Sequence, residues 1–193
     1  GIRNADKDDL IIFSDEDEIP NPNQINYFKK DNYKFGIFLQ NMYFYKINVL
    51  SDDHGYGNWP GSRICKKKHL KSFFDLRLLK VKNINYPFWR IDKEKSINLV
   101  KNGGWHFSYL KNPKDIEKKL KSYLHHIDYD KNPLGIEKIK NVINEKKAIY
   151  DLRVDQRKNK FEAKNKLSRI ESDLMPSYIV NNLEKYKEWI DND

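Results

Sequence analysis

A four-residue apolar run near the start of the chain, from Leu10 to Phe13, constrains the fold most strongly. A short, uninterrupted run of this kind is typical of a strand that is buried on both faces at the centre of an α/β sheet. Four carboxylates follow directly in residues 15–18, and the Ile-Pro-Asn-Pro sequence of residues 19–22 then ends regular structure. The sequence therefore predicts an α/β fold in which acidic side chains follow a buried strand, at a sheet edge where ligands bind in such folds.

Apolar periodicity predicts further strands and helices along the chain. Aromatic residues alternate loosely through residues 33–50, which predicts two strands, and the glycines of residues 52–61 predict a loop. We expect other strands within 63–70 and 105–109, and helices over 23–31, 70–79, 114–126, 133–147 and 177–190. Residues 149–167 fit a hairpin or a charged helix, and we favour the hairpin. No repeat or long linker is visible, so we expect one domain over residues 1–193, with a mixed sheet and flanking helices.

The acidic run requires neutralisation, because adjacent carboxylates repel one another unless water or a cation screens them. On an extended segment, Asp15 and Asp17 point to one side and can hold a hard divalent ion that bridges nucleotide phosphates. A calcium EF-hand is excluded because Pro20 occupies the position that requires glycine. A phosphatase with an aspartyl nucleophile is disfavoured, since Glu18-Ile19-Pro20 stands where those enzymes carry Thr or Ser. A solvated acidic loop remains as the structural alternative.

A second concentration of informative residues lies in the segment from Asn102 to Tyr109. Its two glycines permit unusual backbone angles or a close backbone approach. Aromatic faces pack on the apolar faces of sugar rings, so Trp105 and Tyr109 are candidates for sugar contacts. His106 is a candidate metal ligand, base or phosphate donor, with a buried structural histidine as the alternative.

The net charge of +9 is compatible with nucleic acid, an anionic surface or a phosphorylated substrate as a partner. The basic residues are 30 lysines and 7 arginines, Asn is abundant and Thr is absent, which fits an AT-biased genome. Because specific recognition of phosphates and bases usually recruits arginine, we expect no nucleic-acid partner.

Several further features of the sequence limit the kinds of site and segment that the chain can contain. The lone Cys65 excludes an internal disulfide and a cysteine zinc site, and we expect it to be structural. No run of about 18 apolar residues occurs, so we expect no transmembrane segment. His54 and the His125-His126 pair have ordinary loop or helix-end explanations, and the run Lys66–Lys68 is expected to be a solvated basic edge. The chain starts at Gly1, which indicates that it begins inside a longer or processed protein.

Five motifs follow one another along the chain, namely Ser14-Asp15-Glu16-Asp17-Glu18-Ile19-Pro20, Tyr43-Phe44-Tyr45 with Asn48, Trp59-Pro60-Gly61, Gly103-Gly104-Trp105-His106-Phe107-Ser108-Tyr109 and Met175-Pro176-Ser177-Tyr178. Together they resemble glycosyltransferase family 17, which includes an N-acetylglucosaminyltransferase that adds bisecting GlcNAc to N-glycans. The acidic run alone is a weak motif, whereas the Gly-Gly-Trp-His-Phe-Ser-Tyr string is highly specific. The order and spacing of the motifs match across most of the chain.

The resemblance implies a GT-A-like fold and a metal-dependent, inverting transfer of a sugar onto a glycan hydroxyl, with UDP-GlcNAc as the expected donor. It implies that Asp15 and Asp17 are the DXD ligands of Mn²⁺ or Mg²⁺. Glu18 and His106 are the candidate catalytic bases, together with Asp52 and Asp53 of the glycine-rich loop. The candidate substrate-binding residues are Trp59, Asn102, Gly103, Gly104, Trp105 and Tyr109.

The chain also departs from the family pattern. His125 falls where relatives carry a Ser-Phe-Ser-His string, but Leu124 differs from it. Full members carry a nucleotide-binding βαβ portion before the DXD strand, whereas nine residues precede Leu10, so we expect that N-terminal portion to be truncated and donor binding by this chain to be weak or absent. The runner-up is a non-catalytic, basic domain that binds carbohydrate or nucleic acid. We favour a bacterial or viral cytoplasm over the Golgi lumen.

Overall fold

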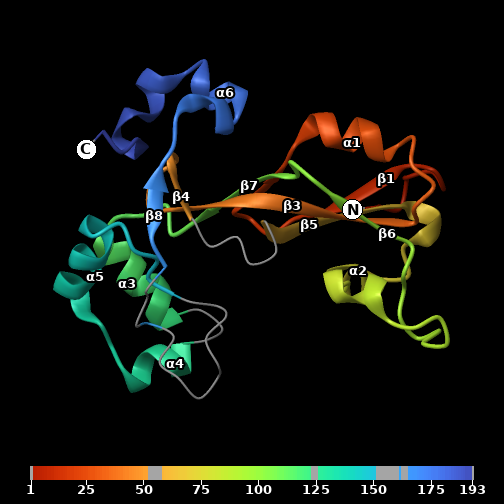
Figure 1. The fold of residues 1–193 in the computed structure, drawn as a ribbon, viewed down its shortest axis with the longest axis horizontal. Helices are drawn as coiled ribbons and strands as arrows, with labels where there is room; N and C mark the ends of the chain where they lie inside the picture. Colours follow the sequence, from red (N-terminus) through yellow and green to blue (C-terminus); the bar gives the residue numbers. More distant parts are fainter. Residues whose placement is uncertain (1, 52–57, 123–125, 151–160, 162–164, 193) are drawn as a thin grey trace. The chain divides into compact units, whose positions relative to one another are not determined.

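The computed structural model describes residues 2–51, 58–122, 126–150, 161 and 165–192 and has a mixed α/β architecture (Figure 1). The sequence predicts one domain, and the chain divides into two compact units. Unit 1 comprises Gly1–Asn41 and Tyr56–His106, and unit 2 comprises Met42–Gly55 and Phe107–Asp193. Each unit is described by itself.

The sheet of unit 1 is mixed, as the sequence analysis expected. Its strands lie in the order β1 (Leu10–Phe13), β5 (Trp59–Lys66), the first part of β3 (Phe35–Phe44) and β6 (Ile97–Val100). The β1–β5 and β5–β3 pairs are antiparallel, and β6 runs parallel to β3. The remaining elements are β2 (Glu18–Pro20), α1 (Pro22–Phe28), η1 (Lys67–His69), α2 (Phe73–Arg77), η2 (Val81–Asn85) and the start of β7 (Gly104–Ser108).

β1 is an edge strand, so its predicted place at the centre of the sheet is wrong: within the described residues it pairs with β5 alone. Ile11 packs in a cluster with Leu76 of α2, whereas Leu10 and Ile12 pack against a cluster that contains Phe28 of α1. The two helices lie on opposite faces of this sheet (Figure 1). The prediction of apolar contacts on both faces of β1 is therefore confirmed. These contacts are made by residues packed around α1 on one face and α2 on the other, at the edge of the sheet.

Helix α1 leads away from the acidic run and begins with local capping. The Asn21 side-chain oxygen accepts a hydrogen bond from the backbone N–H of Asn23, and Pro22 occupies the first turn. Both features favour a helix start. The Asn21 side chain satisfies one of the backbone N–H groups that have no partner within the helix, and proline in the first turn has no N–H that needs one. The sequence predicts that residues 19–22 end regular structure, but β2 includes Ile19 and Pro20 and α1 begins at Pro22, so only Asn21 separates the strand from the helix.

Cys65 is structural, as expected. It lies fully buried in β5, and burial raises the pKa of its thiol to about 11. A thiol with such a pKa is protonated at neutral pH and is a poor nucleophile.

Unit 2 combines a small sheet with helices. The end of β3 pairs with β4 (Val49–Ser51), which pairs with β8 (Leu167–Arg169), both in antiparallel fashion. Its helices are α3 (Pro113–Ser122), α4 (His126–Lys131), α5 (Gly135–Asn144), η3 (Ser172–Leu174), α6 (Ser177–Val180) and η4 (Leu183–Trp189). Ile116 and Leu120, four residues apart on α3, are fully buried with Ile139 of α5, as helical periodicity requires.

The predicted elements agree with these bounds in most places. The predicted strands of residues 33–50 and 105–109 and the helices over 23–31, 70–79 and 133–147 are present, each with shifted ends. The predicted helix over 177–190 is instead a short α6 followed by the 3₁₀-helix η4, and most of the predicted hairpin over 149–167 lies outside the described residues. Where the structure describes the chain, no helix is long and apolar enough to cross a membrane.

Candidate functional site

The antiparallel pairing of β2 with β7 places the acidic run beside the Gly-Gly-Trp-His segment. Glu18 lies opposite His106, and Ile19 lies opposite Trp105. The two segments that carry most of the chemical information in the sequence are thus neighbours in unit 1.

The two glycines of the second segment make this pairing possible. A Cβ on Gly104, whose φ is +123°, would lie 2.1 Å from the carbonyl oxygen of Ile19. A Cβ on Gly103 would lie 2.6 Å from the backbone nitrogen of Leu39. The backbone N–H of Asn21 also donates to the Gly103 carbonyl at 2.9 Å. Close backbone packing, one of the two explanations offered from the sequence, therefore accounts for both glycines, and their role in substrate binding stays a prediction.

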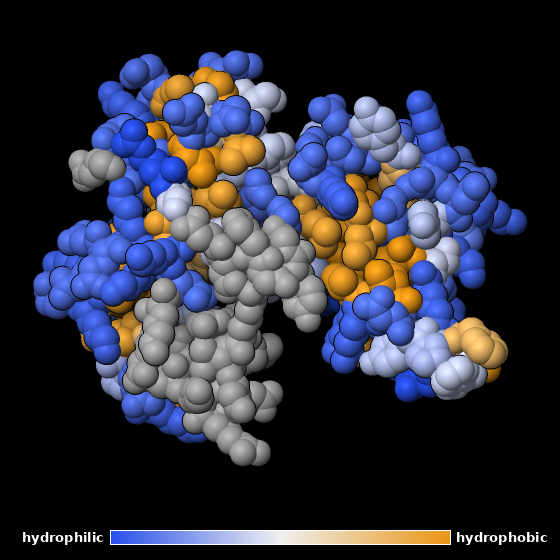
Figure 2. All heavy atoms as spheres, viewed as in Figure 1, coloured by the Kyte–Doolittle hydropathy of each residue, from blue (hydrophilic) through white to orange (hydrophobic). Residues whose placement is uncertain are grey.

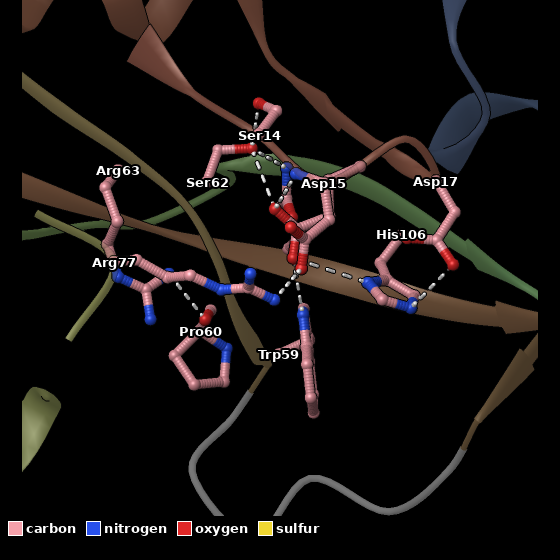
Figure 3. A network of polar contacts seen from close by, with 11 residues as sticks. Ser14, Asp15, Asp17, Trp59, Pro60, Ser62, Arg63, Arg77 and His106 are labelled. Atoms are coloured by element: carbon pink, nitrogen blue, oxygen red, sulfur yellow. Dashed lines mark hydrogen bonds and ion pairs between the residues drawn. The ribbon is translucent and has the colours of Figure 1, made fainter. Parts of the chain in front are cut away.

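The acidic run forms a tight turn, so the extended geometry expected for it is wrong. The backbone N–H of Glu18 donates to the Asp15 carbonyl at 3.1 Å, which closes the turn. The carboxylate of Asp15 faces Arg77, whereas that of Asp17 faces His106 (Figure 3). A turn separates neighbouring negative charges and places the Asp15 carboxylate beside a guanidinium, which lowers the mutual repulsion within the run.

Glu18 is the best-connected carboxylate of the turn, and its side chain is only 6% exposed. Its Oε1 accepts a hydrogen bond from the Trp59 indole at 2.9 Å, and its Oε2 accepts from the Asp15 backbone N–H and the Ser62 hydroxyl, each at 3.3 Å. Burial acts to raise the pKa of Glu18, but the neighbouring His106 ring and the Trp59 donor outweigh burial and lower that pKa below its usual value.

The Ser62 hydroxyl links the Glu18 carboxylate to two other polar side chains. This hydroxyl donates to Glu18 and accepts hydrogen bonds from the Gln40 side-chain amide at 3.1 Å and from the Ser14 hydroxyl at 2.6 Å. Gln40 and Ser62 are buried and Ser14 is exposed, so the network runs from the interior of unit 1 to its surface. The Gln40 side-chain oxygen has no hydrogen-bond partner among the described residues, and the other contacts of the network restrict the rotamer of the Glu18 carboxylate.

His106 lies between two carboxylates. Its Nε2 is 3.9 Å from Asp17 Oδ2, and its Nδ1 is 3.7 Å from Glu18 Oε1 (Figure 3). The Trp59 ring meets the imidazole edge-on, with centroids 5.0 Å apart. Nδ1 is buried and has no hydrogen-bond partner within the described part of the chain. The imidazole is therefore oriented by packing, between two carboxylates that both lie beyond hydrogen-bond distance.

Two arginines lie on the other side of the acidic turn. Arg77 Nη2 is 3.4 Å from Asp15 Oδ2, and its side chain is 61% exposed. Arg63 donates to the carbonyls of Pro60 and Leu79, and burial lowers the pKa of its guanidinium while the Glu18 and Asp15 carboxylates oppose that effect. A depression of about 220 Å³ is lined by Phe13, Asp15, Glu18, Trp59, Pro60, Gly61, Arg63 and Arg77.

The side chains of the acidic turn do not form a closed metal site. Within the described residues, no group of three or more His, Cys, Asp and Glu side chains is arranged to hold a metal ion. Asp15 and Asp17 have side chains that are 47% and 26% exposed. Magnesium-type ions are commonly held by one or two carboxylates, with substrate phosphates and water as the other ligands. The role of Asp15 and Asp17 as metal ligands therefore stays a prediction.

The other predicted site residues lie elsewhere. Trp105 is half-buried on β7, next to His106. Asn102 is exposed, has a φ of +50°, and lines a groove beside α1. Tyr109 belongs to unit 2, where it is buried and stacks on Phe44 with centroids 6.3 Å apart. Asp52, Asp53, His54 and His125 lie outside the described residues.

Several residues of the site were missed by sequence reasoning, namely Ser14, Gln40, Ser62, Arg63 and Arg77. For the arginines a signal was available: in a chain that strongly prefers lysine, an arginine marks a position where a planar, multivalent donor is needed. Ser62 and Gln40 had no such signal, because their role depends on the β5–β3 register.

Comparison of the chain with protein-family models, curated proteins and solved structures found no match.

Proposed function

We propose that the chain carries the catalytic site of a metal-dependent, inverting glycosyltransferase with a GT-A-like fold. One observation carries the proposal: the acidic turn, His106 and Trp59 converge in unit 1 beside two arginines. Carboxylates for a cation, arginines for phosphates and an indole for a sugar ring are the groups that a nucleotide-sugar donor requires. The mixed sheet with flanking helices is compatible with this fold.

The reaction proposed is a single displacement. A hydroxyl oxygen of the glycan acceptor attacks the anomeric carbon of the donor sugar, the bond from that carbon to the diphosphate oxygen breaks, and the nucleoside diphosphate leaves. Asp15 and Asp17 would hold Mn²⁺ or Mg²⁺, which supplies neutralisation of the diphosphate charge. Arg77, which is exposed and paired at 3.4 Å with Asp15, is free to turn toward a phosphate oxygen.

His106 is the best candidate for the base that takes the proton from the acceptor hydroxyl. Glu18 already accepts three hydrogen bonds from Trp59, Asp15 and Ser62, and its lowered pKa makes it a weak base. Glu18 is therefore a positioning residue that orients His106 and Trp59. We propose UDP-GlcNAc as the donor and a glycan as the acceptor.

The metal site can be tested without turnover. Addition of Mn²⁺ should selectively broaden the imidazole NMR signals of His106, because a paramagnetic ion on the acidic turn lies close to this ring. The Asp15→Asn/Asp17→Asn double variant should lose the effect, and Asp173→Asn, an exposed change in unit 2, should retain it. Equal broadening in the double variant would refute the assignment of Asp15 and Asp17 as metal ligands.

Turnover is tested separately. With a panel of nucleotide sugars and Mn²⁺, release of UDP from UDP-GlcNAc should exceed release from the other donors and should fall at least ~100-fold in His106→Gln if this residue is the base. Unchanged release in His106→Gln would refute the assignment of the base. Because we expect weak donor binding by this chain, the donors are supplied at millimolar concentration; no release from any of them, in a chain that binds Mn²⁺ at the turn, would refute the transferase proposal.

A second candidate, metal-independent glycan binding, is favoured by the groove beside α1. This groove, of about 500 Å³, is lined by Asn21, Asn23, Gln24, Asn26, Tyr27, Lys30 and Asn102. Tyr27 is 66% exposed, and within the described residues the side-chain amides of Asn23, Gln24 and Asn26 have no hydrogen-bond partner. Amides beside an exposed ring suit sugar hydroxyls and a sugar face. Glycan binding that persists without metal and is lost in Tyr27→Ala would favour this candidate.

A further inference from the structure

The segment between α2 and β6 exposes an unusual concentration of large apolar side chains. Phe88, Trp89 and Ile91 are 84%, 66% and 93% exposed, all within four residues. Phe74 of α2 is 69% exposed, and Leu78, just after that helix, is 50% exposed. Single exposed apolar residues need no explanation, but a contiguous group does.

The segment projects away from the sheet of unit 1, on the side where α2 lies (Figure 1). In the space-filling view, pale and orange atoms gather at its tip, between hydrophilic atoms (Figure 2). The apolar residues therefore stand on a protrusion and do not line a groove.

Hydrogen bonds hold this tip in its exposed conformation. The Lys95 ammonium donates to the carbonyls of Phe88 and Arg90, at 3.2 Å and 3.0 Å. Arg90 forms a bidentate pair with Asp92, at 2.7 Å and 2.8 Å, and its guanidinium lies 5.2 Å from the Tyr86 ring centroid. The exposed side chains are thus presented by a braced turn, and their exposure is a built feature of the fold.

Basic side chains surround the tip. Residues 77–95 contain six basic and two acidic residues. A depression of about 520 Å³ beside the tip is lined by four lysines and three carboxylates, together with apolar residues that include Leu78 and Tyr86; the charged residues are Lys71, Lys80, Lys82, Lys93, Asp75, Asp92 and Glu94. Within the described residues, Lys71, Lys80 and Lys82 have no acidic partner, so their charge is available to anions.

We propose that this surface, the apolar tip of residues 86–92 with its lysine rim, docks unit 1 on an anionic phospholipid membrane. Phe88, Trp89 and Ile91 insert into the boundary between headgroups and acyl chains, where aromatic side chains are favoured. The surrounding lysines remain among the negative headgroups, to which polybasic surfaces are attracted. The proposal is independent of the transferase reaction.

The chemistry of the tip favours a membrane over RNA. Single-stranded nucleic acid binds by stacking successive bases on aromatic faces, but the Phe88 and Trp89 rings are nearly perpendicular, at 79°, and Ile91 has no ring. The arginine of the tip, the residue type best suited to phosphate recognition, is committed to Asp92. The rim is lysine, whose point charge suits a diffuse anionic surface.

The binding test uses sedimentation of the chain with vesicles. Binding to vesicles of phosphatidylcholine mixed with phosphatidylserine should exceed binding to phosphatidylcholine alone and should weaken with added salt. Phe88→Ser/Trp89→Ser/Ile91→Ser should reduce the partition coefficient at least ~10-fold, since the inserted apolar area is lost. Lys71→Gln/Lys80→Gln/Lys82→Gln should remove the preference for phosphatidylserine. The matched control Tyr27→Ser/Tyr178→Ser, which changes rings that are 66% and 59% exposed elsewhere, should bind like the unaltered chain.

Insertion itself is read from Trp89. Brominated acyl chains should quench part of the tryptophan fluorescence, and Trp89→Phe should abolish that quenching while retaining vesicle binding, because Trp59, Trp105 and Trp189 stay outside the bilayer. Four results would overturn the proposal: no sedimentation with either vesicle, undiminished sedimentation of the triple serine variant, displacement of the chain from vesicles by RNA that binds the tip, or a dimer that the triple serine variant dissociates.

Discussion

At the residue scale, Glu18 shows how one carboxylate organises the site around it. Its two oxygens receive hydrogen bonds from Trp59, Ser62 and the backbone of Asp15, and His106 lies 3.7 Å away. The sequence analysis named Glu18 as a candidate base because of its place in the acidic run. Its burial and its bonds were not predictable, because they depend on β5 residues that the linear pattern does not connect to β2.

The pKa of Glu18 makes its contribution to stability dependent on pH. The folded-state pKa lies below the ordinary value of 4.5, so the ionised form stabilises the fold fully above that value and the stabilisation is lost as pH falls through the folded-state pKa. Glu18→Gln removes this contribution because an amide nitrogen cannot accept the bonds from Ser62 and Asp15. The difference in free energy of unfolding between the unaltered chain and Glu18→Gln should therefore be largest near neutral pH and shrink below about pH 4.

Urea unfolding across this pH range measures that difference. Glu184→Gln is the control, since Glu184 is 96% exposed and its ion pair with Lys187 is long at 3.9 Å. Its effect should stay within about 0.5 kcal/mol at every pH. A difference for Glu18→Gln that grows toward acid would contradict the lowered pKa.

At the scale of elements, apolar patterns predicted the presence of most strands and helices, but they did not predict where each one pairs. The run from Leu10 to Phe13 has the composition of a central parallel strand, yet β1 is an antiparallel edge covered by α1 and α2. A short apolar run predicts that both faces of a strand are buried, but it does not predict where the strand lies in the sheet or which helices cover it. The adjacency of the acidic run and the Gly-Gly-Trp-His segment was likewise hidden, because it requires the β2–β7 register.

The β2–β7 pairing should be sensitive to a single methyl group on Gly104. Gly104→Ala adds a Cβ that would lie 2.1 Å from the Ile19 carbonyl oxygen, at a φ that alanine disfavours. Backbone must move to relieve the clash, so we expect a loss of more than about 3 kcal/mol in the free energy of unfolding, measured in urea.

Gly135 provides the matched control for this change. Its φ of +75° is also positive, but a Cβ there meets nothing within 4 Å. Gly135→Ala should therefore cost only the backbone strain of about 1–2 kcal/mol. Equal losses for the two variants would show that backbone strain alone, and not the approach of β7 to β2, explains Gly104.

At the scale of the whole molecule, the charge of +9 is distributed and partly neutralised. The densest basic run, Lys66–Lys68, contacts acidic and carbonyl groups: Lys66 and Lys68 lie 3.7 Å and 2.7 Å from Asp8, and Lys67 donates to the Ala5 carbonyl. The sequence analysis treated this run as a solvated edge, and the structure adds its local partners. Lysines that already contact acidic or carbonyl groups form a poor phosphate-binding surface. The lysine-rich composition of the chain therefore explains this part of the positive charge better than a phosphate-binding site does.

The chain should therefore bind nucleic acid only through weak, unspecific attraction. At low salt, lysines on any surface attract phosphates, and affinity falls steeply as salt displaces them. At physiological ionic strength, where the screening length is about 8 Å, fluorescence anisotropy of labelled single-stranded RNA or duplex DNA should show no saturable binding at micromolar protein. Lys66→Gln/Lys68→Gln should lower the low-salt affinity only modestly, because Asp8 already offsets one of these two charges and the other lysines of the chain remain. Saturable, metal-independent binding that survives physiological salt would instead favour a nucleic-acid-binding protein, since it would require phosphate or base contacts that an incidental lysine excess does not supply.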